Sequence, residues 1–156
     1  MDFLVLAETP NSGKYDFIEF PEADIWGLVF PKGDALAKKS AICVDDLPGL
    51  ALFCSEQAWL DVIRKWAGNK YSSLHLEGSF RLSYNGSVFA KEGLGYLLTF
   101  DHLVDTSGRS GLVFRPLSPK LETKIYLVWN KHQTFTPIAE RFLSQIKNTF
   151  SGLSDK

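Results

Sequence analysis

The side chains that could perform chemistry are few and far apart along the chain. Three histidines occur, His75, His102 and His132, and none stands at an H-x-x-x-H or H-E-x-x-H spacing. No C-x-x-C pair occurs either, so the sequence contains no metal-site motif. We therefore expect structural or solvated histidines, no metal and no cofactor.

The two cysteines are the candidates for a nucleophile. Cys43 lies in an apolar stretch, where a buried free cysteine behaves as a small hydrophobic side chain. Cys54 directly precedes an expected helix, and a helix N-terminus can lower the pKa of a thiol. No G-x-S-x-G elbow occurs, and the one S-x-x-K match, at residues 144–147, has no S-D-N or K-T-G companion. The sequence therefore favours a protein that is not an enzyme.

Polar and aromatic residues follow two expected strands, at the points where helices should begin. The strands are residues 50–54 and 74–77. The residues at the two junctions are Ser55, Gln57, Ser79, Phe80 and Arg81. In open α/β sheets, ligands bind beyond the carboxyl ends of the strands, and helix N-termini there favour anions. The alternative for Ser55 is that its hydroxyl only caps the helix.

Segments of strand type alternate with segments of helix type. The expected strands are residues 3–6, 15–20, 25–30, 50–54, 74–77, 96–100, 112–114 and 125–129. The expected helices are residues 57–67, residues 82–92 and a last helix that Thr136-Pro137 opens. Gly93 should end the second helix, and Gly95 should let the next strand pack closely. This alternation predicts an α/β protein with a largely parallel sheet.

Composition limits the class of protein. The 156 residues are 45% hydrophobic and carry a formal net charge of −1, which suits one domain of ordinary size with a core. That charge argues against DNA binding by this chain alone, because phosphate binding needs a concentrated positive surface. No apolar run approaches the roughly 20 residues that span a bilayer, and no basic segment of a signal peptide opens the chain. We expect a cytoplasmic protein that does not act at a membrane.

The order of short motifs resembles that of one known family. The matching segments are residues 2–6 (DFLVL), 14–21 (KYDFIEFP), 24–29 (DIWGLV), 34–37 (DALA), 46–47 (DL), 82–85 (LSYN), 91–96 (KEGLGY), 114–117 (FRPL) and 127–129 (LVW). In this order they resemble the effector-binding domain of the LysR-type transcriptional regulators. The resemblance covers roughly residues 1 to 150.

The resemblance implies the α/β fold of type II periplasmic binding proteins, in which two crossover strands join two lobes. Residues 1–30 and 129–150 would form a partial first lobe, residues 31–128 a complete second lobe, and residues 151–156 a frayed tail. The family's winged helix-turn-helix domain and the first two strand–helix units of the first lobe have no counterpart in this sequence. DNA binding is therefore expected only of a longer protein that carries the missing N-terminal domain.

The family binds a small effector in the cleft between its lobes. The ligand-binding residues that the resemblance implies are Ser55, Gln57, Ser79, Phe80, Arg81, Tyr84 and Phe100. Two positions depart from the family: Glu56 stands where a basic residue is usual, and Arg81 stands where an amide is usual. An arginine there could bind a carboxylate effector through two hydrogen bonds.

The leading functional hypothesis is a sensor module whose effector biases lobe closure and, through it, the assembly of a DNA-binding oligomer. Effector domains of the family pair side by side, so a homodimer is expected. One alternative is a fragment of a transport-type solute-binding protein; another is a small α/β enzyme that uses Cys54 or a carboxylate. The helix at residues 57–67 carries apolar side chains such as Trp59 and Trp66, which serve either the core or a partner surface.

Overall fold

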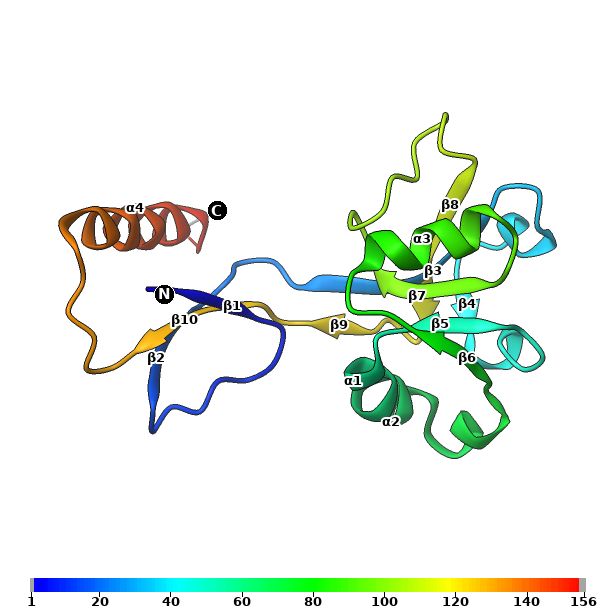
Figure 1. Ribbon diagram of the computed structural model, residues 1–156, viewed down its shortest axis with the longest axis horizontal. Helices are drawn as coiled ribbons and strands as arrows, with labels where there is room; N and C mark the ends of the chain where they lie inside the picture. The colour runs from blue at the N-terminus through cyan, green and yellow to red at the C-terminus, as the bar shows by residue number, and fades with distance from the viewer. Residues whose placement is uncertain (1, 155–156) are drawn as a thin grey trace. The chain divides into compact units, whose positions relative to one another are not determined.

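The computed structural model describes residues 2–154, which form two compact units (Figure 1). Both ends of the chain build unit 1, Met1–Asp24 and Glu122–Lys156, while unit 2 is the continuous segment Ile25–Leu121. Strand β3 (Asp24–Pro31) carries the chain into unit 2, and the short strand β9 (Glu122–Thr123) follows on its return.

We expected lobe boundaries between residues 30 and 31 and between residues 128 and 129. The chain instead divides into units between residues 24 and 25 and between residues 121 and 122. The first boundary lies earlier because the end of β3 is buried in unit 2, where Leu28 and Phe30 belong to the core. The second lies earlier because Leu127 pairs with strands of unit 1.

Unit 1 is a three-stranded antiparallel sheet with one long helix. The strands are β1 (Leu4–Leu6), β2 (Tyr15–Glu19) and β10 (Tyr126–Asn130), and β10 lies between the other two. Helix α4 (Pro137–Ser154) begins at the predicted proline, and the Thr136 hydroxyl accepts a hydrogen bond from the Ala139 N–H at 3.3 Å. The rings of Phe3 and Phe142 lie 5.2 Å apart, so α4 contacts the segment that leads into β1.

The last helix extends past residue 151, the residue from which we expected a frayed tail. Helix α4 continues to Ser154, and the Ser151 hydroxyl donates a hydrogen bond to the Lys147 carbonyl at 2.9 Å. Residues 155–156 lie outside the described residues. Within the described part, no helix is both long and apolar enough to cross a membrane.

Unit 2 is built on one sheet, whose strands lie in the order β4-β8-β3-β7-β5-β6. These strands, besides β3, are β4 (Ile42–Cys43), β5 (Leu52–Cys54), β6 (Leu76–Ser79), β7 (Tyr96–Phe100) and β8 (Leu112–Ser118). The helical segments are η1 (Ala35–Lys38), η2 (Val44–Asp46), α1 (Glu56–Ala58), η3 (Trp59–Ile63), α2 (Arg64–Ala67), η4 (Gly68–Ser73) and α3 (Ser83–Lys91). The segments α1, η3 and α2 follow one another without a gap. They form the helix that we predicted at residues 57–67, and its central part, η3, is π-helical.

The sheet of unit 2 is mixed, so the predicted largely parallel sheet is wrong. β5 runs parallel to β6 and β7, and β4 runs parallel to β8. β3, however, is antiparallel to both of its neighbours, β7 and β8. Strands buried on both faces read as continuous apolar runs whatever their direction, so the residue pattern does not reveal this reversal.

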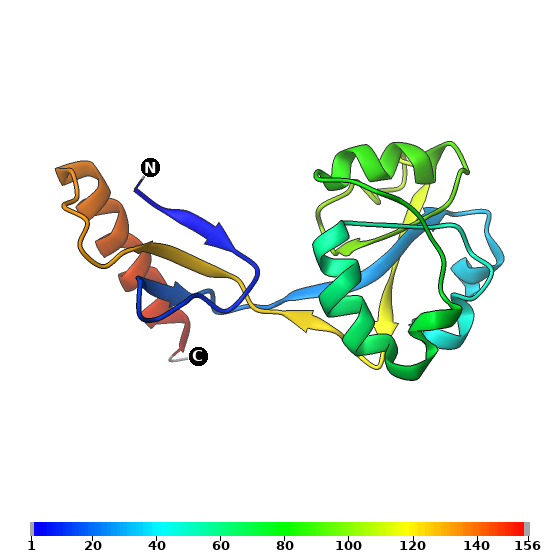
Figure 2. The same cartoon turned by 60° about the horizontal axis from the view of Figure 1, so that its bottom comes forward.

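Helices cover both faces of this sheet (Figure 2). Alternate residues of a strand point to opposite faces, and neighbouring residues of β3 and β7 fall into two separate core clusters. Leu28 and Leu98 pack with Trp59 and Ile63 of the α1–α2 run, whereas the cluster on the other side contains Ala90 of α3. The unit therefore has three layers, and the expected α/β class is confirmed.

The apolar side chains of residues 57–67 serve mainly the core. Trp59 and Ile63 are buried, and Leu60 is the exception, at 56% exposed. Trp66 is half-buried, and its indole N–H donates a hydrogen bond to the Pro119 carbonyl at 2.8 Å.

Candidate functional site

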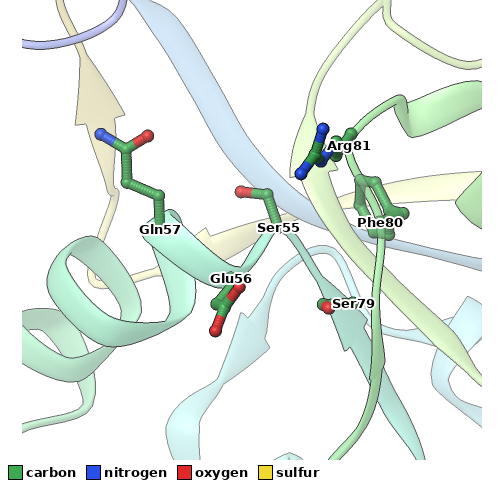
Figure 3. A pocket seen from close by; sticks show the side chains of 6 residues that line it. All are labelled: Ser55, Glu56, Gln57, Ser79, Phe80 and Arg81. Atoms are coloured by element: carbon green, nitrogen blue, oxygen red, sulfur yellow. The ribbon is translucent and has the colours of Figure 1, made fainter.

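A pocket of about 660 Å³ lies in unit 2, just beyond the ends of β5 and β6. The side chains that line it are Ser55, Glu56, Gln57, Ser79, Phe80 and Arg81 (Figure 3). The two strands are parallel neighbours, and Cys54 pairs with Ser79 in their register. Their carboxyl ends therefore meet at one edge of the sheet, which brings together five of the seven residues that we predicted.

Ser55 stands at the N-terminal end of α1, where the chain leaves β5. Its backbone is extended (φ −67°, ψ 139°), as is typical of a residue that precedes a helix. Its side chain nevertheless makes no capping hydrogen bond. The alternative that this hydroxyl serves only as a cap is therefore not what the structure shows, and Figure 3 places it among the pocket side chains.

The ring of Phe80 is held in place from the side of the core. It packs against a buried cluster that includes Phe53, Ala90 and Leu97. Gly86 of α3 makes room for this ring, because a Cβ atom at Gly86 would lie 2.9 Å from Phe80 Cε1. The glycine that weakens the predicted helix therefore has a packing purpose, and it fixes one wall of the pocket.

Two opposite charges line the pocket without neutralising each other. Glu56 and Arg81 are both exposed. Among residues 2–154, neither side chain takes part in an ion pair or a side-chain hydrogen bond. Both charges are therefore available to a ligand.

Glu56 is the pocket residue that our site prediction omitted. The sequence carried a signal for it, because Glu56 stands between two predicted site residues, Ser55 and Gln57. The resemblance to the family does not predict it, because a basic residue is usual at this position.

Tyr84 and Phe100, the other two predicted residues, do not line this pocket. Tyr84 lies in the first turn of α3 and is 75% exposed. Phe100 ends β7, and its ring packs against Trp26 of the neighbouring strand, with ring centroids 4.4 Å apart. The aromatic side chain of Phe100 is therefore used in the packing of unit 2.

Cys54 is unsuited to act as a nucleophile. Its side chain is fully buried at the end of β5, and burial raises the pKa of its thiol to about 12. A thiol with that pKa stays protonated at neutral pH, whereas the reactive form is the thiolate. The other thiol, Cys43, is exposed rather than buried as its apolar neighbours suggested. In the described part of the chain, no three His, Cys, Asp or Glu side chains are grouped so that they could hold a metal ion.

Comparison with protein families decides what kind of domain this is. Residues 1–151 match the family model described as the LysR substrate binding domain. The chain belongs to this family. No curated protein sequence matches it.

Solved structures of LysR family proteins share the fold of this LysR domain. The regulatory domain of Synechocystis PCC6803 CcmR, in complex with 2-PG, is 17% identical, with a TM-score of 0.73 over 96% of this chain and 73% of that chain. The effector-binding domain of QuiR, in complex with shikimate, is 13% identical, with a TM-score of 0.76 over 97% and 72%. Full-length CbnR, complexed with its target DNA, is 12% identical, with a TM-score of 0.74 over 95% and 50%.

The LysR domain therefore has the type II periplasmic-binding-protein-like α/β fold that the motif order implied. It spans about half the length of full-length CbnR and of two LysR family proteins from Pseudomonas aeruginosa. It spans about seven-tenths of the CcmR and QuiR domains.

Proposed function

We propose that this chain is the effector-binding part of a LysR-type transcriptional regulator, and that a small molecule binds in the pocket at the ends of β5 and β6. The effector would change the assembly and DNA binding of the full-length protein, which would act in the cytoplasm. No bond would be made or broken. DNA would be contacted only by an N-terminal domain of the full-length protein.

One observation carries the proposal: two neighbouring strand ends present hydroxyl, amide, aromatic and charged side chains around one pocket. A few convergent polar groups beside an aromatic wall are typical of small-molecule sites. The proposal also draws support from CcmR and QuiR, whose similar domains were solved with 2-PG and with shikimate. Arg81 suits a carboxylate group, because a guanidinium can donate two parallel hydrogen bonds to it.

The two alternatives receive less support. An enzyme that uses Cys54 is opposed by the burial and raised pKa of that thiol. A transport-type solute-binding protein shares the fold, and fold alone does not separate the two classes. The match of residues 1–151 to the LysR family favours the sensor.

The direct test is a thermal-shift screen of the chain against small carboxylates and other metabolites. A ligand at about 100 times its dissociation constant should stabilise the fold by about 2.7 kcal/mol. Ser79→Ala and Arg81→Ala should each reduce the shift, because both side chains line the pocket. Ser107→Ala, in an exposed loop away from the pocket residues, is the control and should leave the shift unchanged. A ligand whose shift survives both pocket substitutions would contradict this site.

The proposal includes a homodimer, as is usual for symmetric soluble assemblies. Unit 1 supports it, because apolar side chains such as Val5 and Ile138 are exposed there, Ile138 at 83%. Sedimentation equilibrium should then show a dimer, and a monomer at high protein concentration would contradict this part of the proposal.

A further inference from the structure

The chemistry of the pocket points to a narrower class of effector than its family membership does. Its lining contains one carboxylate, Glu56, and one guanidinium, Arg81, together with the Ser55 and Ser79 hydroxyls and the Phe80 ring. A simple anion would be attracted by Arg81 and repelled by Glu56. A simple cation would be attracted by Glu56 and repelled by Arg81.

The two charged groups stand apart in the pocket. In Figure 3 the Arg81 guanidinium lies above Ser55 and the Glu56 carboxylate below it. The part of the chain that the structure describes offers neither of them an ion-pair partner. A ligand that satisfies both must therefore carry a negative and a positive group on one small molecule.

We propose that the effector is a zwitterion of the amino-acid class. Its carboxylate would accept hydrogen bonds from Arg81, and its ammonium group would donate to the Glu56 carboxylate. Charge-assisted hydrogen bonds of this kind are about twice as strong as neutral ones. The Phe80 ring, which packs beside Gly86 and the core, would contact the apolar part of the effector's side chain. The Ser55 and Ser79 hydroxyls could accept or donate hydrogen bonds toward either end of the effector. This inference rests on the proposed function, because it names the ligand class of the same pocket.

Matched probes can separate the two charges of the ligand. The natural amino acids are screened by isothermal titration calorimetry, and the tightest binder is compared with its N-acetyl derivative, which lacks the positive charge, and its carboxamide, which lacks the negative one. Both derivatives should bind at least about tenfold more weakly, since each loses a charge-assisted bond. An N-acetyl derivative that binds as tightly as the parent amino acid would overturn the inference.

Substitutions of Glu56 and Arg81 test the same two contacts by changing the protein instead of the ligand. Glu56→Gln should weaken the amino acid at least about tenfold but should not weaken the N-acetyl derivative, because that derivative has no ammonium group to bind Glu56. Arg81→Gln should weaken the amino acid but should not weaken its carboxamide, because the carboxamide has no carboxylate to bind Arg81. Glu56→Arg should reverse the preference toward a dicarboxylate probe such as succinate. Glu92→Gln and Arg109→Gln, exposed residues outside the pocket, are the matched controls.

The outcomes distinguish this inference from the proposed function. If carboxylates without an amine bind best, depend on Arg81 and are not weakened by Glu56→Gln, the zwitterion is wrong and the sensor pocket stands. If amino acids fail to bind and no other compound of the metabolite screen binds at millimolar concentration, both fail.

Discussion

At the scale of single residues, Tyr96 shows how one hydrogen bond joins distant parts of unit 2. Its hydroxyl donates to the Asp34 carboxylate, with 2.6 Å between Tyr96 Oη and Asp34 Oδ2. The other carboxylate oxygen of Asp34 accepts from the Leu36 N–H at 2.8 Å and so caps the short helix η1. The hydrogen bond to Asp34, with burial adding to it, raises the pKa of the Tyr96 hydroxyl to about 12. The first turn after β3 is therefore tied to the start of β7.

Tyr96→Phe should lower the free energy of unfolding by about 1–2 kcal/mol at neutral pH, because a hydrogen bond to a charged group is lost. In the folded state the pKa of Tyr96 is raised from 10.0 to about 12, so its contribution is complete below pH 10 and is lost as the pH rises toward 12. Urea unfolding of wild type and variant between pH 8 and about 12 should show the difference shrinking in that window.

Tyr84→Phe is the matched control, since Tyr84 is largely exposed in α3. It should not change the stability at any pH. A Tyr96→Phe difference that stays constant up to pH 12 would show that the hydroxyl does not donate to Asp34 in solution.

At the scale of elements, α3 depends on a residue that a helix would normally avoid. A Cβ atom at Gly86 would lie 2.6 Å from Leu97 Cδ1 as well as 2.9 Å from Phe80 Cε1. Leu97 is fully buried, so it has little room to move. Gly86 lowers the local stability of α3 but allows the helix to approach the sheet closely.

Gly86→Ala should therefore destabilise unit 2, although alanine has the better helix propensity. The gain in propensity is about 1 kcal/mol, and overpacking of a core costs about 1–3 kcal/mol, so we expect a net loss of about 1 kcal/mol. Urea denaturation followed by tryptophan fluorescence would measure it. Asn85→Ala, one residue earlier at an exposed position, should be neutral or slightly stabilising, and a stabilised Gly86→Ala variant would contradict the packing shown here.

The elements that could be predicted are those whose signals are local. β7 occupies the predicted residues 96–100, and Gly93, at φ 72°, ends the helix just before it as predicted. Gly95 allows the close packing that we expected, because a Cβ there would lie 2.4 Å from the Ala51 carbonyl oxygen. The direction of β3 could not be predicted, since it depends on which strands become its neighbours.

The same distinction applies to the candidate site. The residues at the ends of β5 and β6 could be predicted to meet, because parallel neighbours end at the same edge. The positions of Tyr84 and Phe100 depend on how α3 and β7 turn their side chains, which is decided by packing rather than by position in a motif.

At the scale of the whole molecule, the two units differ in how well their strands are protected. β3 is hydrogen-bonded on both sides and contains fully buried residues such as Leu28 and Phe30. β1 is an edge strand of only three residues, and Leu4 and Val5 are exposed. Opening β1 therefore exposes little new apolar surface, whereas opening β3 disrupts the core of unit 2.

Native-state hydrogen exchange should reflect this contrast. Amides of β3 and β7 should exchange only through global unfolding of unit 2, and those of β1 through local opening at lower free energy. Exchange followed by mass spectrometry of peptides resolves the two strands. Equal protection of β1 and β3 would show that the chain unfolds as one cooperative body.

The order of elements along the chain also determines the order in which the protein can fold during synthesis. All of unit 2 leaves the ribosome before β10, the strand that lies between β1 and β2. Domains generally fold as units while the chain is still growing, so unit 2 can complete its core first. Until β10 is synthesised, β1 and β2 lack the strand that pairs with both of them. A nascent chain that stalls before residue 126 therefore exposes the unpaired backbone groups of β1 and β2 to chaperones.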